Sequence, residues 1–310
     1  MKKNTVKKDL PLGLYIHIPF CRSKCAYCDF YSLAGAEERM DDYCRALERH
    51  LAEVAPQAEC HKADTVYFGG GTPSYLGAER LCRLLGSIRK LYKVDKHAEI
   101  TLEANPDSAT DRKTLKRLRK AGFNRLSLGV QSMDDALLQA IGRIHTRQQV
   151  QEAVAAARKA GFKNLSLDLI YGLPGQTMEG WEKTLSDAVG LLPEHLSCYG
   201  LKLEEGTPLY ERRAELTLPD EEQQADMYLY AVEFLKQCGY NYKNGYIFME
   251  DITEDEYEEQ KQRCIAEIFS PYSGMDEFKK RVNNLLTLHK AGMLTEEEFV
   301  SYKTKLMSDL

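Results

Sequence analysis

The chain has 310 residues, 43% of them hydrophobic, and a formal net charge of −5, so it can bury a full-sized core as one large domain or as one domain with an appendage. Positive and negative residues are interspersed, which predicts no nucleic-acid partner because no broad basic face is available for a phosphate backbone. No apolar run approaches the roughly eighteen residues of a membrane-spanning helix, and the first residues lack the apolar stretch of a signal peptide, so we expect a cytoplasmic protein without a membrane span.

Short apolar strands alternate with amphipathic helices along the chain. We expect strands at residues 14–18, 65–69, 98–104, 125–130, 164–170 and 195–201. Apolar residues at three- and four-residue intervals predict helices between them, for example over 38–54 and 111–122. Such alternation implies parallel pairing through right-handed crossovers. We therefore predict an α/β fold, a partial (β/α)6 TIM-like barrel over residues 12–240, after an N-terminal tail at 1–11.

An internal near-copy supports this pattern. "KAGFNRLSLGVQ" begins at Lys120 and "KAGFKNLSLDLI" begins at Lys159. In each copy a helical stretch ends at a glycine, Gly122 or Gly161, and a short apolar strand follows. Glycine adopts the left-handed C-cap conformation at low cost, so the sequence predicts the same helix-to-strand joint twice.

The first expected strand leads into a cysteine-rich loop, "YIHIPFCRSKCAYCDFYS", at residues 15–32. Cys21, Cys25 and Cys28 have the spacing C-x3-C-x2-C, which can hold three irons of a four-iron four-sulfur (4Fe–4S) cluster and leave the fourth iron open. A second possibility is a zinc site that adds His17, although that histidine lies within the expected strand and the spacing differs from the paired C-x2-C of zinc ribbons. A third is three buried thiols that act as small hydrophobic side chains.

Other polar or glycine-rich positions follow the later strands. "GGGTP" at 69–73 follows the second strand, Glu103 ends the third, Gln131 follows the fourth and Asp168 lies late in the fifth. The carboxyl ends of parallel barrel strands meet at one rim, so we expect these residues on the same face as the cysteine loop. The glycines would let a ligand approach the backbone closely, although a glycine triplet can also be a flexible turn. A carboxylate such as Asp168 within an apolar strand is costly if it has no partner.

Together these motifs resemble the radical S-adenosylmethionine enzymes. "YIHIPFC", "FGGGTPSYL", "GVQSMDDALLQAIGRIHT" and "DLIYGLPGQT" are similar to the subfamily of the oxygen-independent coproporphyrinogen III oxidase (HemN) and the haem chaperone HemW. The resemblance runs from about Leu12 to Gly239. It implies a 4Fe–4S cluster whose open iron binds S-adenosylmethionine, and a reductant such as flavodoxin or ferredoxin. The reduced cluster then gives one electron to the sulfonium, which releases methionine and a 5′-deoxyadenosyl radical.

The resemblance also implies which residues bind the cofactors. Tyr15, Gly70 and Glu103 match positions used for a first S-adenosylmethionine, where Glu103 would accept hydrogen bonds from the ribose hydroxyls. The residues that match positions for a second cofactor molecule or its neighbouring pocket are Tyr27, Gly71, Thr72, Gln131, Arg143 and Asp168. Without the resemblance, Gln131 would be interpreted as a loop hydrogen-bonding residue, and Arg143, which we expect on a helix, as a solvated charge. No catalytic residue beyond the cluster is assigned.

The residues after the third cysteine distinguish the branches of the subfamily. The oxidase has a further cysteine two positions after the third, where this chain has Phe30. Phe30, and Trp181 in "GLPGQTMEGWEKTL", resemble the chaperone branch, which implies haem or porphyrin binding and transfer to a haem-acceptor protein. Two alternatives remain: an oxidase that decarboxylates the propionates of coproporphyrinogen III, and a non-catalytic truncated remnant. Whether the chain is an enzyme is left open.

The resemblance ends after Tyr240. Subfamily members continue with a Tyr-Glu-Ile-Ser-Asn-Phe-Ala stretch, a His-Asn-x-x-Tyr-Trp motif tied to haem or substrate handling, and a helical domain, none of which occurs here. We expect instead an acidic helical segment and linker at 241–273 and a helical hairpin at 274–310 that resembles the SHOCT-type helical pair. Thr295 and Glu298 are spaced as a capping box for its second helix. The altered tail leaves haem and substrate handling in doubt.

Overall fold

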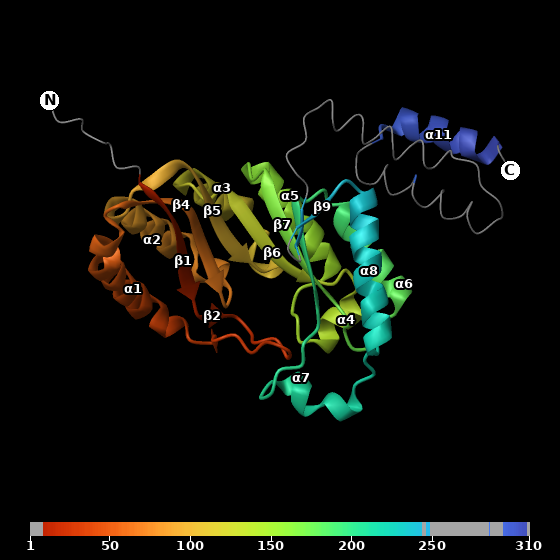
Figure 1. Cartoon of the computed structure of the whole chain (residues 1–310), viewed down its shortest axis with the longest axis horizontal. Coiled ribbons are helices and arrows are strands. Elements are labelled where there is room, and N and C mark those ends of the chain that lie inside the picture. Colours follow the sequence, from red (N-terminus) through yellow and green to blue (C-terminus); the bar gives the residue numbers. More distant parts are fainter. Residues whose placement is uncertain (1–8, 244–245, 249–284, 286–293, 309–310) are drawn as a thin grey trace. The chain divides into compact units, whose positions relative to one another are not determined.

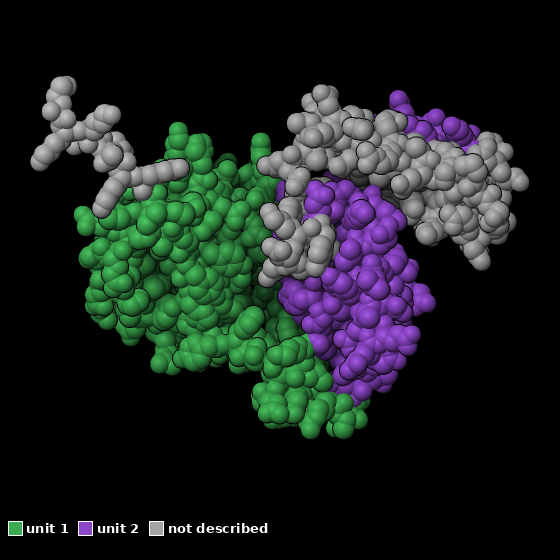
Figure 2. Space-filling model, in the orientation of Figure 1, with its two compact units in different colours: residues 1–130, 138–166, 202–215 green, residues 131–137, 167–201, 216–310 purple. Residues whose placement is uncertain are grey.

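The computed structural model describes residues 9–243, 246–248, 285 and 294–308 (Figure 1). The chain divides into two compact units, shown in different colours in Figure 2. Unit 1 comprises Met1–Val130, Leu138–Ser166 and Lys202–Glu215, and unit 2 comprises Gln131–Leu137, Leu167–Leu201 and Leu216–Leu310.

The helices and strands alternate as the sequence predicts. The strands are β1 (Leu10–Ile18), β2 (Phe20–Cys21), β3 (Leu33–Ala34), β4 (His61–Gly70), β5 (Val94–Ala104), β6 (Arg125–Gln131), β7 (Asn164–Tyr171), β8 (His195–Gly200), β9 (Asn241–Lys243) and β10 (Tyr246–Phe248). The α-helices are α1 (Met40–Val54), α2 (Ala78–Leu91), α3 (Arg112–Ala121), α4 (Asp135–Ala140), α5 (Arg147–Ala160), α6 (Met178–Val189), α7 (Pro208–Glu211), α8 (Glu221–Gln237) and α11 (Glu296–Ser308). Short 3-10 helices are η1 (Glu37–Arg39), η2 (Ala55–Ala58), η3 (Pro73–Leu76), η4 (Pro106–Ser108) and η5 (Arg213–Glu215).

The main sheet has the strand order β1-β4-β5-β6-β7-β8-β10-β9 among the described residues. In unit 1, β1 pairs with β4, β4 with β5 and β5 with β6, all in parallel. The six expected strands correspond to β1, β4, β5, β6, β7 and β8, and the predicted α/β partial barrel is confirmed. The sequence analysis did not predict β9 and β10, which add to the sheet by antiparallel pairing of β10 with β8 and with β9.

In the unit 1 strands, buried apolar side chains alternate with side chains on the opposite face, which carries the polar residues. Ile16 on β1, Phe68 on β4 and Leu102 on β5 are buried, and the Phe68 ring meets that of Phe123 edge-on at 5.1 Å between centroids. Successive side chains of a strand point to opposite faces. The neighbours of these residues in sequence, including Tyr15, therefore point to the other face of the sheet.

The repeated helix-to-strand joint is present in both copies. Gly122 and Gly161 have φ angles of 118° and 96°, in the left-handed region, and end α3 and α5. The next residues, Phe123 and Phe162, are 0% and 1% exposed. Each joint therefore turns the chain at a glycine and buries a phenylalanine, which is the Schellman-type ending that the sequence predicts.

Unit 2 packs α6 against α8. Trp181 is fully buried, and its Nε1 donates a hydrogen bond to the carbonyl oxygen of Met227 at 2.8 Å. The hydroxyl of Tyr240 donates to the carbonyl oxygen of Pro193 at 2.8 Å, which fixes the chain after α8. Trp181 therefore has a structural partner for its one polar atom.

In the C-terminal region the structure describes α11 and the residues before it. Thr295 Oγ1 accepts from the Glu298 backbone N–H at 3.2 Å, and Glu298 Oε2 accepts from the Thr295 backbone N–H at 2.8 Å. This is the expected capping box. Of the segment expected at 241–273, residues 241–243 and 246–248 form the strands β9 and β10, and the rest lies outside the described residues. Most of the first helix of the expected hairpin, with Phe278, Val282 and Leu286, also lies outside them. Within the described part of the chain, no helix is both long and apolar enough to cross a membrane.

Candidate functional site

The strand ends of β1 and β4 bring the glycine turn beside the start of the cysteine loop in unit 1. Ile18 lies opposite Gly70 in the parallel register. The pairing continues beyond the strands, because Gly71 donates from its backbone N–H to the Ile18 oxygen at 2.9 Å and Thr72 donates to the Phe20 oxygen at 2.8 Å. "GGGTP" is therefore fixed against the chain that leads into Cys21.

The glycines of this turn cannot be replaced without a clash. A Cβ atom on Gly70, whose φ is 116°, would lie 2.7 Å from the His17 ring. A Cβ atom on Gly71 would lie 2.8 Å from the Phe20 carbonyl oxygen and 3.0 Å from Cys21 Sγ. These separations are shorter than normal van der Waals contacts, so the glycines form a tightly fitted cradle and not a flexible turn.

Glu103 closes one side of this cradle. Its Oε2 accepts from the Gly70 backbone N–H at 3.0 Å, and its Oε1 accepts from the Tyr67 hydroxyl at 2.7 Å. The Tyr15 ring stacks on that of Tyr67 with 5.9 Å between centroids, and Tyr15 remains 60% exposed. Burial and the Glu103 charge raise the pKa of Tyr15. The sequence analysis missed Tyr67, although its position before "GGGTP" on the same face as Tyr15 could have indicated it.

The cysteine loop is fixed at its middle and its end. The backbone N–H of Ala26 donates to the Ile141 oxygen at 3.0 Å, and the Ala26 oxygen accepts from the Leu209 N–H at 2.8 Å. At the end of the loop, Leu33 donates to the Pro19 oxygen at 2.7 Å. Its first cysteine is buried and the other two are half-buried. The loop thus keeps a defined path although little of it is helix or strand.

Side-chain donors reach two of the three thiols. Thr72 Oγ1 donates to Cys21 Sγ at 3.5 Å, and Arg143 Nη1 donates to Cys25 Sγ at 3.3 Å. Burial raises the pKa of Cys28, and the other two thiols act in the same direction. Thr72 and Arg143 thus place hydrogen-bond donors at two of the three sulfur atoms of the loop.

Arg143 lies between α4 and α5 and not on a helix, contrary to the expectation from sequence. Its Nη2 donates to the Gly129 carbonyl oxygen at 2.5 Å and to Asn105 Oδ1 at 2.8 Å. Burial acts to lower the pKa of Arg143, but Cys25 and Tyr27 outweigh it and the pKa is raised. Burial also raises the pKa of Tyr27 well above its usual range. Arg143 is therefore a buried cation beside the cysteine loop.

The histidine of the zinc alternative has other neighbours. His17 Nε2 lies 3.1 Å from the Tyr31 carbonyl oxygen, and Nδ1 lies 3.4 Å from the Tyr15 hydroxyl. Among the described residues, no three histidine, cysteine or acidic side chains converge on a position for a single metal ion. Three thiols on one loop, with a glycine cradle against Cys21, form a donor set that fits three irons of a 4Fe–4S cluster.

Two predicted site residues lie in unit 2. Gln131 has a φ of 66° and is 6% exposed, and its Oε1 accepts from the Tyr199 hydroxyl at 3.2 Å. Asp168 is half-buried on β7. Burial, together with Asp168, raises the pKa of Cys198 to about 12. A left-handed glutamine costs conformational energy and is typical of a functional site. The sequence analysis missed Tyr199 and Cys198 as its neighbours.

Comparison with known proteins identifies the family. The sequence profile of the radical SAM superfamily matches residues 15–188. The chain belongs to the radical SAM superfamily. Members of this superfamily bind a 4Fe–4S cluster and S-adenosylmethionine, which are therefore the cofactors of this chain.

The chain is similar to several haem chaperones named HemW. The haem chaperone HemW of Lactococcus lactis is 42% identical over 234 residues, which are 75% of this chain and 60% of that protein. HemW of Bacillus subtilis is 42% identical over 217 residues, 69% of this chain and 57% of that protein. HemW of Escherichia coli is 38% identical over 231 residues, 74% of this chain and 60% of that protein. The chain thus spans about 60% of the length of these relatives.

Solved structures show the same fold. Coproporphyrinogen III oxidase (HemN) from Escherichia coli has a TM-score of 0.72 and 28% identity, over 84% of this chain and 60% of the oxidase chain. Elp3 from Methanocaldococcus infernus has a TM-score of 0.51 and 19% identity, over 72% of this chain and 54% of that chain, and shares the fold alone. The resemblance to the HemN and HemW subfamily that the motifs indicate is therefore confirmed.

Proposed function

We propose that this chain binds a 4Fe–4S cluster through Cys21, Cys25 and Cys28, binds S-adenosylmethionine at the open iron, and acts in haem binding and transfer. The observation that carries the proposal is the fit of the cysteine loop to its surroundings. A Cβ atom on Gly71 would lie 3.0 Å from Cys21 Sγ, and Arg143 donates to Cys25 Sγ. The lack of room for a side chain at Gly71 and the hydrogen bond from Arg143 support a ligand loop over scattered core thiols.

The residues around the loop have separate tasks in this proposal. When it is bound and reduced, the cluster supplies one electron to the sulfonium of S-adenosylmethionine. Gly70 fits closely against His17 because it carries no side chain, and the Glu103 carboxylate beside it is suited to accept from ribose hydroxyls. The exposed ring of Tyr15 offers an apolar surface beside them.

A second cofactor molecule, or the neighbouring pocket, would use the other predicted residues. In unit 1 these are Tyr27, Gly71, Thr72 and Arg143. Buried Arg143 can pair with a carboxylate, because a guanidinium forms strong charge-assisted hydrogen bonds with one. In unit 2 the candidates are Gln131 and Asp168, and the Tyr199 hydroxyl limits the orientations of the Gln131 amide.

Haem handling is proposed from the HemW relatives and from Phe30. Phe30 stands where the oxidase has its further cysteine, and its side chain is 65% exposed. The similarity to the structure of the Escherichia coli oxidase HemN favours, as a second candidate, decarboxylation of coproporphyrinogen III. The third alternative is a chain that keeps the cluster but no longer handles haem or substrate.

Several predictions made from sequence belong to this proposal. We propose two protein partners: a flavodoxin- or ferredoxin-type reductant and a haem acceptor. We also propose that the protein is cytoplasmic. The domain limits, with a barrel at 12–240, a segment at 241–273 and a hairpin at 274–310, are also proposed.

Radical chemistry is tested by anaerobic reconstitution with iron and sulfide, followed by a reductant and S-adenosylmethionine. We expect the wild-type chain to form 5′-deoxyadenosine and a Cys21→Ala, Cys25→Ala, Cys28→Ala variant to form none. The matched control replaces three cysteines outside the loop, Cys60→Ala, Cys82→Ala and Cys238→Ala, and should form the product at the wild-type rate. Equal product from the wild type and the loop variant would refute the radical assignment.

Haem titration of the same preparations tests the chaperone assignment. We expect haem binding that is weaker than in a full-length HemW, because the His-Asn-x-x-Tyr-Trp motif tied to haem handling does not occur in this sequence. Tight stoichiometric binding would contradict that expected weakening. No binding at all, with an intact cluster, would favour the non-handling alternative. Decarboxylation of added coproporphyrinogen III would favour the oxidase.

A further inference from the structure

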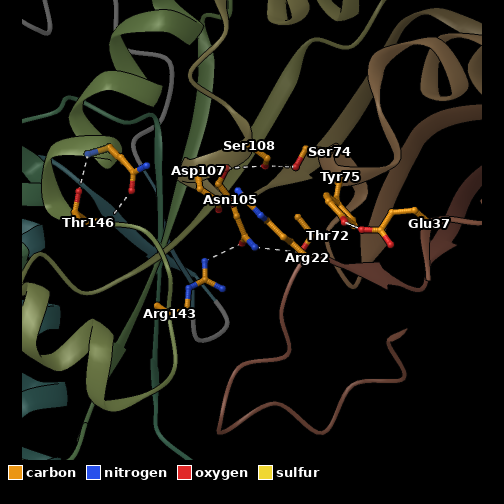
Figure 3. Close-up of polar contacts among 11 residues, drawn as sticks. Arg22, Glu37, Thr72, Ser74, Tyr75, Asn105, Asp107, Ser108, Arg143 and Thr146 are labelled. Atoms are coloured by element: carbon orange, nitrogen blue, oxygen red, sulfur yellow. Dashed lines mark hydrogen bonds and ion pairs between the residues drawn. The ribbon is translucent and has the colours of Figure 1, made fainter. Parts of the chain in front are cut away.

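A chain of hydrogen-bonded side chains in unit 1 joins two of the three loop cysteines. Asn105 is at its centre: its Nδ2 donates to Thr72 Oγ1 at 3.1 Å, and its Oδ1 accepts from Arg143 Nη2 at 2.8 Å, as Figure 3 shows. At the two ends, Thr72 Oγ1 donates to Cys21 Sγ at 3.5 Å and Arg143 Nη1 donates to Cys25 Sγ at 3.3 Å. The Asn105 amide therefore contacts both Thr72 and Arg143, the two residues that donate hydrogen bonds to the cysteine sulfurs.

The amide of Asn105 limits where each donor can point. A hydroxyl has one proton and two lone pairs, so when Asn105 donates to Thr72 Oγ1, the Thr72 proton is left for Cys21. The guanidinium of Arg143 is planar, and its Nη2 is fixed by Asn105 and by the Gly129 oxygen. Its Nη1 is then turned toward Cys25.

Asn105 itself is well placed. It precedes the short helix η4 (Pro106–Ser108), and Ser108 Oγ donates to the Asn105 carbonyl oxygen at 2.8 Å. Ser108 Oγ also lies 2.6 Å from Ser74 Oγ, so the loop after β5 is tied to the loop after β4 (Figure 3). The backbone of Asn105 is therefore fixed independently of its amide. The sequence analysis used Glu103, two positions earlier, and gave Asn105 no role.

We propose that Asn105 is a positioning residue that raises the reduction potential of the cluster by directing Thr72 and Arg143 at the sulfurs of Cys21 and Cys25. Reduction adds negative charge to an iron–sulfur cluster, and hydrogen bonds to the sulfurs stabilise that charge. The proposal rests on the proposed function, since it needs the cluster to be bound. It concerns the ease of reduction and not the identity of the ligands.

The test is a redox titration of the reconstituted full chain, followed by the electron paramagnetic resonance signal of the reduced cluster. Thr72→Val keeps the shape of Thr72 and removes its hydroxyl, and Thr72→Ser keeps the hydroxyl. We expect Thr72→Val to shift the potential to a more negative value, by at least a threefold change in the reduction equilibrium, which is about 28 mV for one electron. Thr72→Ser should restore the wild-type potential.

The central variant is Asn105→Ala, which should lower the potential by at least as much as Thr72→Val. Adding Thr72→Val to Asn105→Ala should lower it by less than the sum of the single shifts, because both act on the same sulfur. Ser87→Ala on α2 is the control: it removes a hydroxyl that donates to Glu48 and reaches neither sulfur, and the potential should not change.

Two results would overturn the proposal. One is a wild-type potential in Asn105→Ala with the cluster intact, and the other is equal shifts in Thr72→Val and Thr72→Ser. If Asn105→Ala fails to fold, the comparison of Thr72→Val with Thr72→Ser still tests whether the hydroxyl affects the potential. Asn105→Asp can then replace Asn105→Ala in the test of whether the two shifts in potential add. Absence of a cluster from the wild-type chain would refute the proposed function. A cluster that is bound, but whose potential is the same in the wild type and the variants, would refute only the role of Asn105.

Discussion

The cysteine loop and the helix-to-strand joints of unit 1 are stabilised in different ways. The loop exposes large side chains, with Phe30 and Tyr31 65% and 72% exposed, and is fixed by a few backbone hydrogen bonds such as those of Ala26. The joints bury Phe123 and Phe162 almost completely. Substitutions at the joints should therefore change the free energy of unfolding, whereas substitutions in the loop should change ligand binding and leave stability nearly unchanged.

The largest effect on stability is expected at a joint. Phe123→Ala should lower the free energy of unfolding by about 3–5 kcal/mol, since it opens a cavity beside the Phe68 ring. Phe30→Ala, the matched control in the loop, should change it by less than about 0.5 kcal/mol. Urea denaturation of the cluster-free protein measures both. Equal losses in the two variants would break the comparison.

The glycine cradle ends β4, whose Phe68 packs on Phe123 of a joint, and it also fits against Cys21 of the loop, so a substitution there should affect both properties. Gly71→Ala places a Cβ 2.8 Å from the Phe20 oxygen and 3.0 Å from Cys21 Sγ. We expect a loss of about 1–3 kcal/mol in unfolding free energy from overpacking, and iron content near that of the cysteine variant. Iron analysis and urea denaturation measure these changes.

The control for this variant is Gly86→Ala on α2, where the added Cβ would meet no atom within 4 Å. Alanine favours a helix over glycine by about 0.5–1 kcal/mol, so this variant should be slightly stabilised and keep its iron. Full iron content in Gly71→Ala would show that the cradle does not constrain the loop.

A smaller effect is expected at Glu103, which we propose as a residue of the S-adenosylmethionine site. Glu103→Gln removes the negative charge of the carboxylate that accepts hydrogen bonds from the Gly70 N–H and the Tyr67 hydroxyl. Hydrogen bonds to charged groups contribute about 1.5–3 kcal/mol, so the affinity for S-adenosylmethionine should fall at least tenfold. Glu99→Gln, on the exposed part of β5, should bind with wild-type affinity, as measured by calorimetry of the reconstituted protein. Equal affinities of the two variants would remove Glu103 from the site.

The effect expected at neutral pH is smallest for Cys198, a cysteine on β8 outside the loop, because its contribution changes only at high pH. The pKa of Cys198 is raised from an ordinary value near 9 to about 12, so between these pH values the folded state retains a proton that the unfolded state loses. The stabilising contribution is complete below pH 9 and is lost as the pH rises toward 12. Between pH 9 and 12 the unfolding free energy of Cys198→Ala should therefore fall less steeply with pH than that of the wild type, by up to about 1.4 kcal/mol per pH unit. An unchanged slope would contradict the raised pKa.

The alternation of strands and helices could be predicted because each short apolar run and each glycine cap is a local feature. Gly122 and Gly161 end their helices as their sequence context indicates. The strands β9 and β10 could not be predicted in the same way, since they are three residues each and depend on pairing with β8. Their existence is decided by a distant part of the chain and not by their own residues.

A ligand loop could be proposed from the sequence alone, because the spacing of Cys21, Cys25 and Cys28 is a local feature. The contacts around it could not. Asn105 has an ordinary sequence context, and it acquires a role only because parallel register places β4 and β5 side by side. Arg143 was expected on a helix, but it lies in the connection before α5, from which it reaches Cys25. Such contacts join residues far apart in sequence, and periodicity carries no information about them.

The central claim is that three cysteines hold a 4Fe–4S cluster with one iron open to S-adenosylmethionine. The most direct test is the electron paramagnetic resonance spectrum of the reduced, reconstituted chain before and after S-adenosylmethionine is added, together with iron and sulfide content. We predict about four iron and four sulfide per chain and a spectrum that changes when the cofactor binds. Iron content no higher than in the Cys21→Ala, Cys25→Ala, Cys28→Ala variant, or a spectrum that S-adenosylmethionine leaves unchanged, would contradict it.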